Sequence, residues 1–581
     1  MVGVTVLSPK PRAQAVSSDC SSRGTGVDLS GCDLTGLNLT DVNFTDANLT
    51  DAILTNATLT FGYFIRTNLT NAILTNATFT FADFTGANLT GANLTGAKLR
   101  FANLDSANLA DTTLTNVLSQ GITGTPSALP TDYELIGGYL IGPAANLASA
   151  ILASANLTGV NLAGANLTNA TLSNVTSGGI SGTPSALPTN WLLLSGYLIG
   201  PTANLTNADL KYIQLTNSSL SGTILTNANL SHAVLHDVNL DSTDLTTVNL
   251  TGLSAKGITG SPTLPPYWQL RNSYLIGPTA NFTGANLAGF DLSGANLTRV
   301  TFIGANLSGT NFTGANLTGV SSWGNTGTPA SLPLGWVIHS GYLLGPTAYL
   351  PGASFATATD LTGVNLSNAY LANSTFAAVN LTNAIFSGVN LSGATMTNAT
   401  LNGANLSGAY LSNGNFRGVN FGTANLTGAN LTGANLTGAN LSGATLTNAI
   451  WSNTVCPDGS NSNSNGNTCA GYLTTITPTA TNTPTATNTP TATNTSTATN
   501  TSTATNTSTA TNTPTNSSTP TKSNTRTATA TRTVTPSRTN TPTRSKTATR
   551  TPTRTRTPTR TAIGGLGKPV RTMTATATRR P

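Results

Sequence analysis

The segment ANLTGANLTGANLTGANLSG, residues 424–443, contains four copies of one five-residue repeat. In an α-helix, the leucines of successive repeats would lie about 140° apart around the axis, so no face would become apolar. In a straight strand they would alternate between the two faces, because five is an odd number. The period therefore excludes both regular structures for this segment.

A closed polygon satisfies the same period. Within one repeat, Ala424 and Leu426 are two residues apart, so an extended segment places both side chains on one side. The chain must then turn before Ala429, and Gly428 suits this corner because glycine tolerates unusual backbone angles. Repeated bends place Ala and Leu inside and Asn, Thr and the corner outside, which predicts a solenoid.

The repeat extends over more than half of the chain. We count 63 repeats, and the central residue is Leu or Phe in 61 of them, with Met396 and Trp451 as the exceptions. The position two residues earlier is usually Ala. A register kept over so many repeats excludes chance. The repeats occupy residues 27–116, 145–174, 203–252, 280–319, 348–357 and 359–453.

This pattern resembles that of the pentapeptide-repeat family. The resemblance implies an all-β fold over residues 27–453, a right-handed quadrilateral β-helix with four repeats in each coil. At the usual spacing between strands, about 16 coils would form a rod roughly 75 Å long. Each central leucine would contribute about 1.5–3 kcal/mol through burial, and coils would stabilise one another only by stacking.

Four similar insertions interrupt the repeats, and their lengths of 28, 28, 27 and 28 residues indicate one recurring module. Each contains a Gly-Thr-Pro-like stretch and a Leu-Pro stretch, which are typical of turns. The later half predicts two short strands around Gly-Gly, Ser-Gly or Asn-Ser, as in a β-hairpin. The insertions lie near residues 118–144, 176–202, 254–279 and 321–347.

One aromatic residue recurs shortly before each predicted hairpin turn: Tyr133, Trp191, Trp268 and Trp336. These side chains could form a row of surface contacts for a sugar or a partner protein, because insertions in repeat proteins often carry binding. Alternatively, each ring packs its own hairpin onto the rod. We favour packing.

The four cysteines lie in pairs at the two ends of the repeats. Cys20 and Cys32 are 12 residues apart, and Cys456 and Cys469 are 13 apart in a loop at residues 454–473. This arrangement predicts two disulfides that cap exposed sheet edges in an exported protein, although Cys32 also occupies an inward position where a free thiol would pack. The absence of a Cys-x-x-Cys spacing argues against zinc.

We predict no enzymatic activity, no cofactor and no metal site. His232 and His236 are four residues apart, which is a metal-ligand spacing only on a helix, and this segment is not helical. The loop NSNSNG at 461–466 resembles a calcium loop in outline, but calcium requires carboxylates and only Asp458 supplies one nearby. Paired acids such as Asp241 and Asp244 are expected on the surface.

The first 26 residues are interpreted as a leader. Ala13–Ala15, read as Ala-Gln-Ala, resembles the end of a secretory signal, although the positive region and most of the apolar core are missing. We therefore expect the natural start to lie upstream and the protein to be extracellular or at the cell surface; if the terminus is complete as given, a cytoplasmic location is expected. No stretch reaches the ~18–20 apolar residues of a membrane span.

Residues 474–581 form a tail of different composition. They are rich in Thr and Pro and hold 14 Lys and Arg with no acid, whereas the rest holds 11 basic residues against all 18 acids, a net charge of −7. So few large apolar residues cannot offset the entropy of ordering, which predicts a disordered stalk. Its charges could bind anionic cell-envelope polymers or nucleic acid, or they could be incidental to a spacer.

Three functions remain open from the sequence. The first is a non-enzymatic, exported structural or adhesive protein, a rigid rod on a flexible cationic stalk, with self-association as one candidate interaction. The second follows from the resemblance, since some family members mimic DNA and bind DNA gyrase; outer positions rich in Asn, Thr, Ser and Gly rather than acids argue against it. The third is a surface of outward Asn and Thr ladders that binds polysaccharide or ice.

Overall fold

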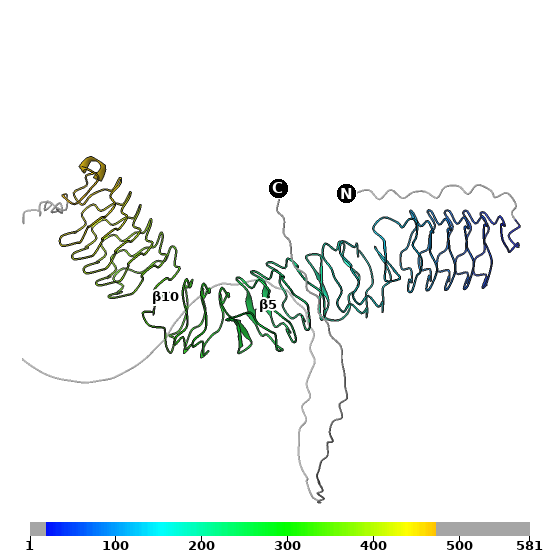
Figure 1. Cartoon of the computed structure of the whole chain (residues 1–581), viewed down its shortest axis with the longest axis horizontal. Helices are drawn as coiled ribbons and strands as arrows, with labels where there is room; N and C mark the ends of the chain where they lie inside the picture. The colour runs from blue at the N-terminus through cyan, green and yellow to red at the C-terminus, as the bar shows by residue number, and fades with distance from the viewer. Residues whose placement is uncertain (1–18, 472–581) are drawn as a thin grey trace, which may run out of the picture. The chain divides into compact units, whose positions relative to one another are not determined.

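Parallel bridges between residues 20 positions apart define the coil of this protein, so four five-residue repeats complete one turn. The computed structural model describes residues 19–471, and the predicted tail and most of the leader lie outside this range. The described residues form a right-handed quadrilateral β-helix, as predicted, and Figure 1 shows its successive coils from blue to yellow. Most sides of a coil are too short to form more than one bridge with the next.

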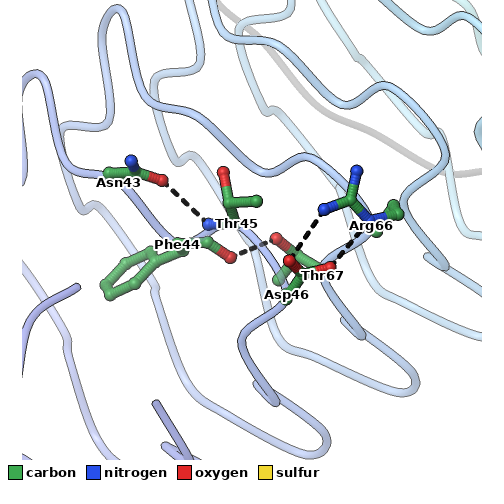
Figure 2. Close-up of polar contacts among 6 residues, drawn as sticks. All are labelled: Asn43, Phe44, Thr45, Asp46, Arg66 and Thr67. Carbon is green, nitrogen blue, oxygen red and sulfur yellow. Dashed lines mark hydrogen bonds and ion pairs between the residues drawn. The ribbon is translucent and has the colours of Figure 1, made fainter. Parts of the chain in front are cut away.

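Many corners combine two local features, and Figure 2 shows the first of them, a hydrogen bond, for one repeat. The backbone N–H of Thr45 donates to Oδ1 of Asn43 at 3.0 Å, so the outward Asn side chain closes the turn that follows Phe44. The residue after the turn, Asp46, adopts a left-handed conformation with φ 60°. Asn, Asp and Gly tolerate this conformation best, which explains their frequency at the corner.

Inward positions are apolar or hydrogen-bonded, with the exception of Ser374, whose buried hydroxyl has no partner among the described residues. Phe44 is fully buried, and Thr67, which replaces the usual inward Ala, donates its hydroxyl to the carbonyl of Phe44 at 2.6 Å (Figure 2). Buried threonines at residues 112, 223, 243, 310 and 454 donate in the same way to a carbonyl 23 residues earlier. Burying a hydroxyl costs little when it is hydrogen-bonded, so these substitutions fit the core.

We name the four sides of the coil A to D from their bridges near the first insertion. Side A contains Asn108 and Ala128, side B Thr113, side C Leu118 and Asn146, and side D Thr123. The chain therefore passes through sides C, D and A within the insertion and replaces only side B with a longer segment. Applied to the later bridges, the same assignment places the second insertion's longer segment on side D and the third and fourth on side B.

Each longer segment is an antiparallel β-hairpin, so the predicted hairpins are confirmed. The hairpins are β1 (Glu134–Ile136) with β2 (Tyr139–Ile141), β3 (Leu192–Leu194) with β4 (Tyr197–Ile199), β7 (Gln269–Arg271) with β8 (Tyr274–Ile276), and β9 (Val337–His339) with β10 (Tyr342–Leu344). The remaining elements are the parallel pair β5 (Val234–His236) and β6 (Ser254–Lys256) and the 3-10 helix η1 (Ser462–Asn465).

Three of the hairpins divide the apolar core. In β2, Leu140 belongs to the core of the coils before the hairpin, whereas Tyr139 and Ile141 belong to the core after it. In the same way, β4 and β8 each contribute neighbouring residues to different cores. Neighbouring residues of a strand point in opposite directions, so one strand contributes side chains to the core on each side of it.

A buried serine fixes the hairpin in three of the four insertions. Ser177 occupies the central inward position where Leu is usual, and its hydroxyl accepts the backbone N–H of Leu198 at 2.9 Å. Ser119 and Ser322 accept the N–H of Leu140 and Leu343 in the same way. The third insertion has Ala at this position, residue 255.

Replacing Ser177 with Ala should loosen the second hairpin. The substitution leaves the N–H of Leu198 without its acceptor in a buried site, which costs about 1–3 kcal/mol. We expect a lower melting temperature and faster hydrogen exchange across β3 and β4. As a control, Ser442→Ala removes an exposed hydroxyl and should change neither quantity; equal effects of the two substitutions would refute this account.

Candidate functional site

The four recurring aromatic residues pack against their own hairpins. A methyl group built on Gly142, Gly200, Gly277 or Gly345, each just after the second strand, would lie within 3 Å of the ring of Tyr133, Trp191, Trp268 or Trp336, respectively. Trp336 is buried, and the other three rings are half-buried. Their geometry is that of packing residues, with one ring face covered by glycine backbone.

Tyr133 differs from the three tryptophans because its hydroxyl also donates to the carbonyl of Pro143. Burial raises the pKa of Tyr133 to about 12. An open cleft of about 530 Å³ lies beside it, with Ile122, Leu129 and Leu135 as apolar lining and Glu134 as its charged group. This cleft is the larger of the two hollows that stand out among residues 19–471.

Gly200→Ala tests the packing of the aromatic ring. Gly200 has no positive φ, so the backbone accepts Ala, but the added methyl group would overlap Trp191. Overpacking of this kind costs about 1–3 kcal/mol of unfolding free energy, measurable by circular dichroism in denaturant. The penalty should shrink in combination with Trp191→Leu, since contacting residues are not additive. Gly471→Ala, with open space around its added methyl, is the control; additive penalties for residues 191 and 200 would contradict the contact.

Both cysteine pairs form disulfides. Cys20 and Cys32 have Cα atoms 5.6 Å apart, and Cys32 is buried at an inward position of the first coil. Cys456 and Cys469 have Cα atoms 5.4 Å apart and are fully buried. The second disulfide holds a loop containing η1, which is capped by Asn461 at its N-terminus and by Gly466, in a left-handed conformation with φ 71°, at its C-terminus. Each disulfide therefore lies at one end of the described solenoid.

The loop that resembles a calcium site is occupied by its own hydrogen bonds. Asp458 accepts the hydroxyl of Ser460 at 2.6 Å and its backbone N–H at 2.9 Å, and these bonds lower the pKa of Asp458. Asn465 donates to the hydroxyl of Ser460 at 2.6 Å. No group of three or more potential metal ligands gathers among residues 19–471.

The outward Asn and Thr ladders are largely used by the solenoid itself. Asn68, for example, accepts the N–H and the hydroxyl of Thr70 and donates its amide to Thr50 on the previous coil, at 2.9 Å. Asn88 repeats this arrangement, and Asn108 accepts the N–H of Ala110 and donates its amide to Thr90 on the previous coil. A ligand would have to compete with these bonds, so the ladders are better explained as supports of the corners and of coil stacking.

One serine–histidine pair has the distance expected of an activated nucleophile. Nε2 of His236 lies 3.0 Å from Oγ of Ser254, beside Lys256, in a pocket of about 190 Å³. Burial, followed by the charge of Lys256, lowers the pKa of His236. Within the described residues, no carboxylate accepts a hydrogen bond from the imidazole of His236, so the pair lacks the third group that such nucleophiles use. His232 lies elsewhere, stacked on Tyr212 with ring centroids 5.1 Å apart.

Two groups of exposed aromatic side chains were not singled out from the sequence. Phe61, Phe81 and Phe101 stack on one corner, with centroids 5.2 and 5.0 Å apart, although a left-handed conformation is unusual for a bulky residue. The second group, on side C, includes Tyr349 and Tyr370. The signal that could have revealed both is an aromatic residue at an outward position, repeated at intervals of about 20 residues.

A solenoid of 20-residue coils with hairpin insertions and capped ends defines a β-helical repeat protein. The family model for pentapeptide repeats matches residues 25–117, 144–176, 213–252, 280–319 and 359–453 in overlapping copies, more than half of the chain. The chain belongs to the pentapeptide-repeat family. Proteins of this family are generally structural or binding proteins rather than enzymes. No curated protein sequence is significantly similar to this chain.

Solved structures of pentapeptide-repeat proteins align with parts of this chain. HetL, involved in heterocyst differentiation regulation in the cyanobacterium Nostoc sp. strain PCC 7120, is 23% identical, and the alignment covers 53% of this chain and 92% of that one, with a TM-score of 0.17. A pentapeptide-repeat protein of the Arabidopsis thaliana thylakoid lumen is 32% identical, and the alignment covers 17% of this chain and 67% of that one, with a TM-score of 0.15. QnrB1, a plasmid-mediated fluoroquinolone resistance protein, is 16% identical, and the alignment covers 41% of this chain and 89% of that one, with a TM-score of 0.17. TM-scores this low carry no argument about function.

Proposed function

We propose that this protein is an exported, non-enzymatic structural or adhesive protein, a rigid β-helical solenoid joined to a basic tail. The observation that carries the proposal is the pair of disulfides, Cys20–Cys32 and Cys456–Cys469, one at each end of the described solenoid. Disulfides persist in oxidising compartments and are rare in the cytosol. No helix within residues 19–471 is long and apolar enough to span a membrane.

The position of the disulfides gives them a structural role in such a protein. The last coil of a β-helix exposes unpaired backbone groups that could pair with another chain. After the last repeat, the disulfide-closed loop bonds back onto that coil: Ser462 N–H donates to the carbonyl of Thr454 at 2.8 Å, and Asn453 N–H donates to Oδ1 of Asn463 at 2.8 Å. A covalently closed cap suits a protein that must survive outside the cell, without chaperones.

The charge distribution supports binding to surfaces rather than imitation of DNA. Between residues 300 and 455, Asp360 is the only acid, so this long part of the solenoid carries a single acidic side chain. The tail, in contrast, carries 14 basic residues and no acid. In our proposal the tail attracts anionic cell-envelope polymers electrostatically, while the solenoid acts as a spacer and scaffold.

Cell fractionation with thiol labelling tests the export proposal. We expect the protein outside the cytoplasm, with none of its four cysteines alkylated before reduction and all four alkylated afterwards. Replacing both Cys456 and Cys469 with Ala should lower the unfolding free energy by about 2–4 kcal/mol, because the closed loop restricts the unfolded chain. A cytoplasmic protein with four reactive thiols would overturn the proposal.

Removal of the tail tests the electrostatic partner. A chain ending at residue 473 should lose affinity for an anionic polymer such as teichoic acid or polyphosphate, because its net charge is −7. Binding of the full chain should weaken steeply between 20 mM and physiological salt, where the Debye length falls to about 8 Å. Unchanged binding after truncation would assign recognition to the solenoid instead.

A further inference from the structure

Side C of the last part of the solenoid carries a column of exposed tyrosines. Tyr349, Tyr370 and Tyr410 are 47%, 38% and 54% exposed. Bridges join Tyr349 to Tyr370, Tyr370 to Asn390 and Asn390 to Tyr410, so the three tyrosines lie above one another, with Asn390 between the second and the third. Exposed large aromatic side chains gathered in one column, interrupted only by Asn390, form a patch that a soluble protein rarely leaves without a role.

An exposed tryptophan lies on the same side one coil earlier, two residues beyond Ser321, which is the residue in the column of Tyr349. Trp323 is 56% exposed and follows Ser322 on side C. The backbone N–H of Tyr349 donates to the carbonyl of Val320 at 2.8 Å, which places Trp323 on the coil directly before that of Tyr349. We call Trp323, Tyr349, Tyr370 and Tyr410 the aromatic face.

The hydroxyl groups of the face are available to a ligand. The hairpin tyrosines Tyr139, Tyr197 and Tyr342 use their hydroxyls structurally, each accepting a backbone N–H from the next coil at 3.0, 3.2 and 3.2 Å. In contrast, none of the hydrogen bonds among residues 19–471 includes the hydroxyl of a tyrosine of the aromatic face. These three phenols therefore combine an exposed ring with a free polar group.

The spacing of the coils would admit one ring between Tyr370 and Tyr410, and we call this position over Asn390 the slot. The rings of Tyr349 and Tyr370 stack with centroids 5.0 Å apart and planes 17° apart. Because the two residues lie on successive coils, the planes of their rings are roughly perpendicular to the solenoid axis. Tyr370 and Tyr410 are two coils apart, or about 9.6 Å at the usual strand spacing. A ring inserted above Asn390 would lie about 4.8 Å from each tyrosine, within the range in which rings stack.

The floor and the surroundings of the slot are polar but uncharged. Oδ1 of Asn390 accepts the N–H of Ser392 at 3.0 Å, which leaves its amide nitrogen to donate. Between residues 300 and 455 the charged side chains are Asp360 and Arg417, and they lie on sides A and D. An uncharged ligand rich in hydroxyl groups complements this surface, whereas a polyanion or polycation finds no opposite charge on it.

We propose that the aromatic face binds a neutral polysaccharide. A sugar ring offers apolar C–H groups on its faces, which stack on Tyr370 and Tyr410, and hydroxyl groups at its edge, which hydrogen-bond to the phenols and to Asn390. Exposed Trp323 and Tyr349 provide further stacking surface for neighbouring sugars of the same chain. The inference names the ligand class of the adhesive function proposed above and rests on it for its biological meaning.

Affinity electrophoresis of the purified full chain tests this inference. Gels containing a soluble neutral glycan, hydroxyethyl cellulose or glycogen, should retard the protein. Tyr370→Ala and Tyr410→Ala should each weaken the interaction about tenfold, since a lost ring contact costs on the order of 1.4 kcal/mol. Tyr63→Ala is the matched control, because Tyr63 is 49% exposed but lies in the first part of the solenoid. Circular dichroism of each variant should show an unchanged fold.

Each of three results would overturn the inference. The first is free migration in all the neutral glycans, and the second is an equal loss in Tyr63→Ala. The third is a change of self-association, measured by sedimentation, that follows Tyr370→Ala without any glycan binding, which would assign the face to a second copy of the chain. Glycan binding is measured on purified protein, so its result is independent of where the protein is located in the cell. The glycan inference can therefore be refuted while the export proposal is confirmed, and the reverse is also possible.

Discussion

The backbone hydrogen bonds between successive coils are the interaction on which the whole structure depends. Leu431 N–H donates to the carbonyl of Ile450 on the next coil, and Ile450 N–H donates back to Ala429. These paired bonds hold only if each side uses five residues, so they impose the corner conformation and the inward leucine on the sequence. A single extra residue is tolerated near Ala358, where bridges join residues 21 apart.

Such a regular framework leaves little room for function in its own consensus residues. The inward residues fill the core, and the outward Asn side chains are engaged by the turn that follows and by the coil before. Recognition is therefore expected where the consensus is broken, either by an inserted hairpin or by an unusual outward side chain. The aromatic face belongs to the second kind, since Tyr349, Tyr370 and Tyr410 occupy positions where Asn is most common.

Much of the fold could be predicted from the sequence because a five-residue period admits few geometries. The hairpins could also be predicted, since each insertion carries turn residues between two short apolar runs. The serines that anchor them could not, because Ser119 and Ser177 occupy central positions where Leu or Phe is usual, so the sequence pattern ends one repeat early. The aromatic face was missed for a different reason: its tyrosines are 21 and 40 residues apart in the sequence, because Asn390 occupies the coil between Tyr370 and Tyr410, so they form no local motif.

The number of repeats between insertions has a directional consequence. Six repeats separate the first insertion from the second, ten the second from the third, and eight the third from the fourth. Because a coil has four sides, eight repeats return a hairpin to the same side, whereas six or ten turn it by half a revolution, from side B to side D and back. Gain or loss of two repeats would thus move every later hairpin to the opposite side of the solenoid, relative to the earlier hairpins, without altering a residue in it. The number of repeats in this protein therefore sets the direction of each hairpin around the solenoid axis as well as the length of the solenoid, so changes in repeat number can reorient whole surfaces during evolution.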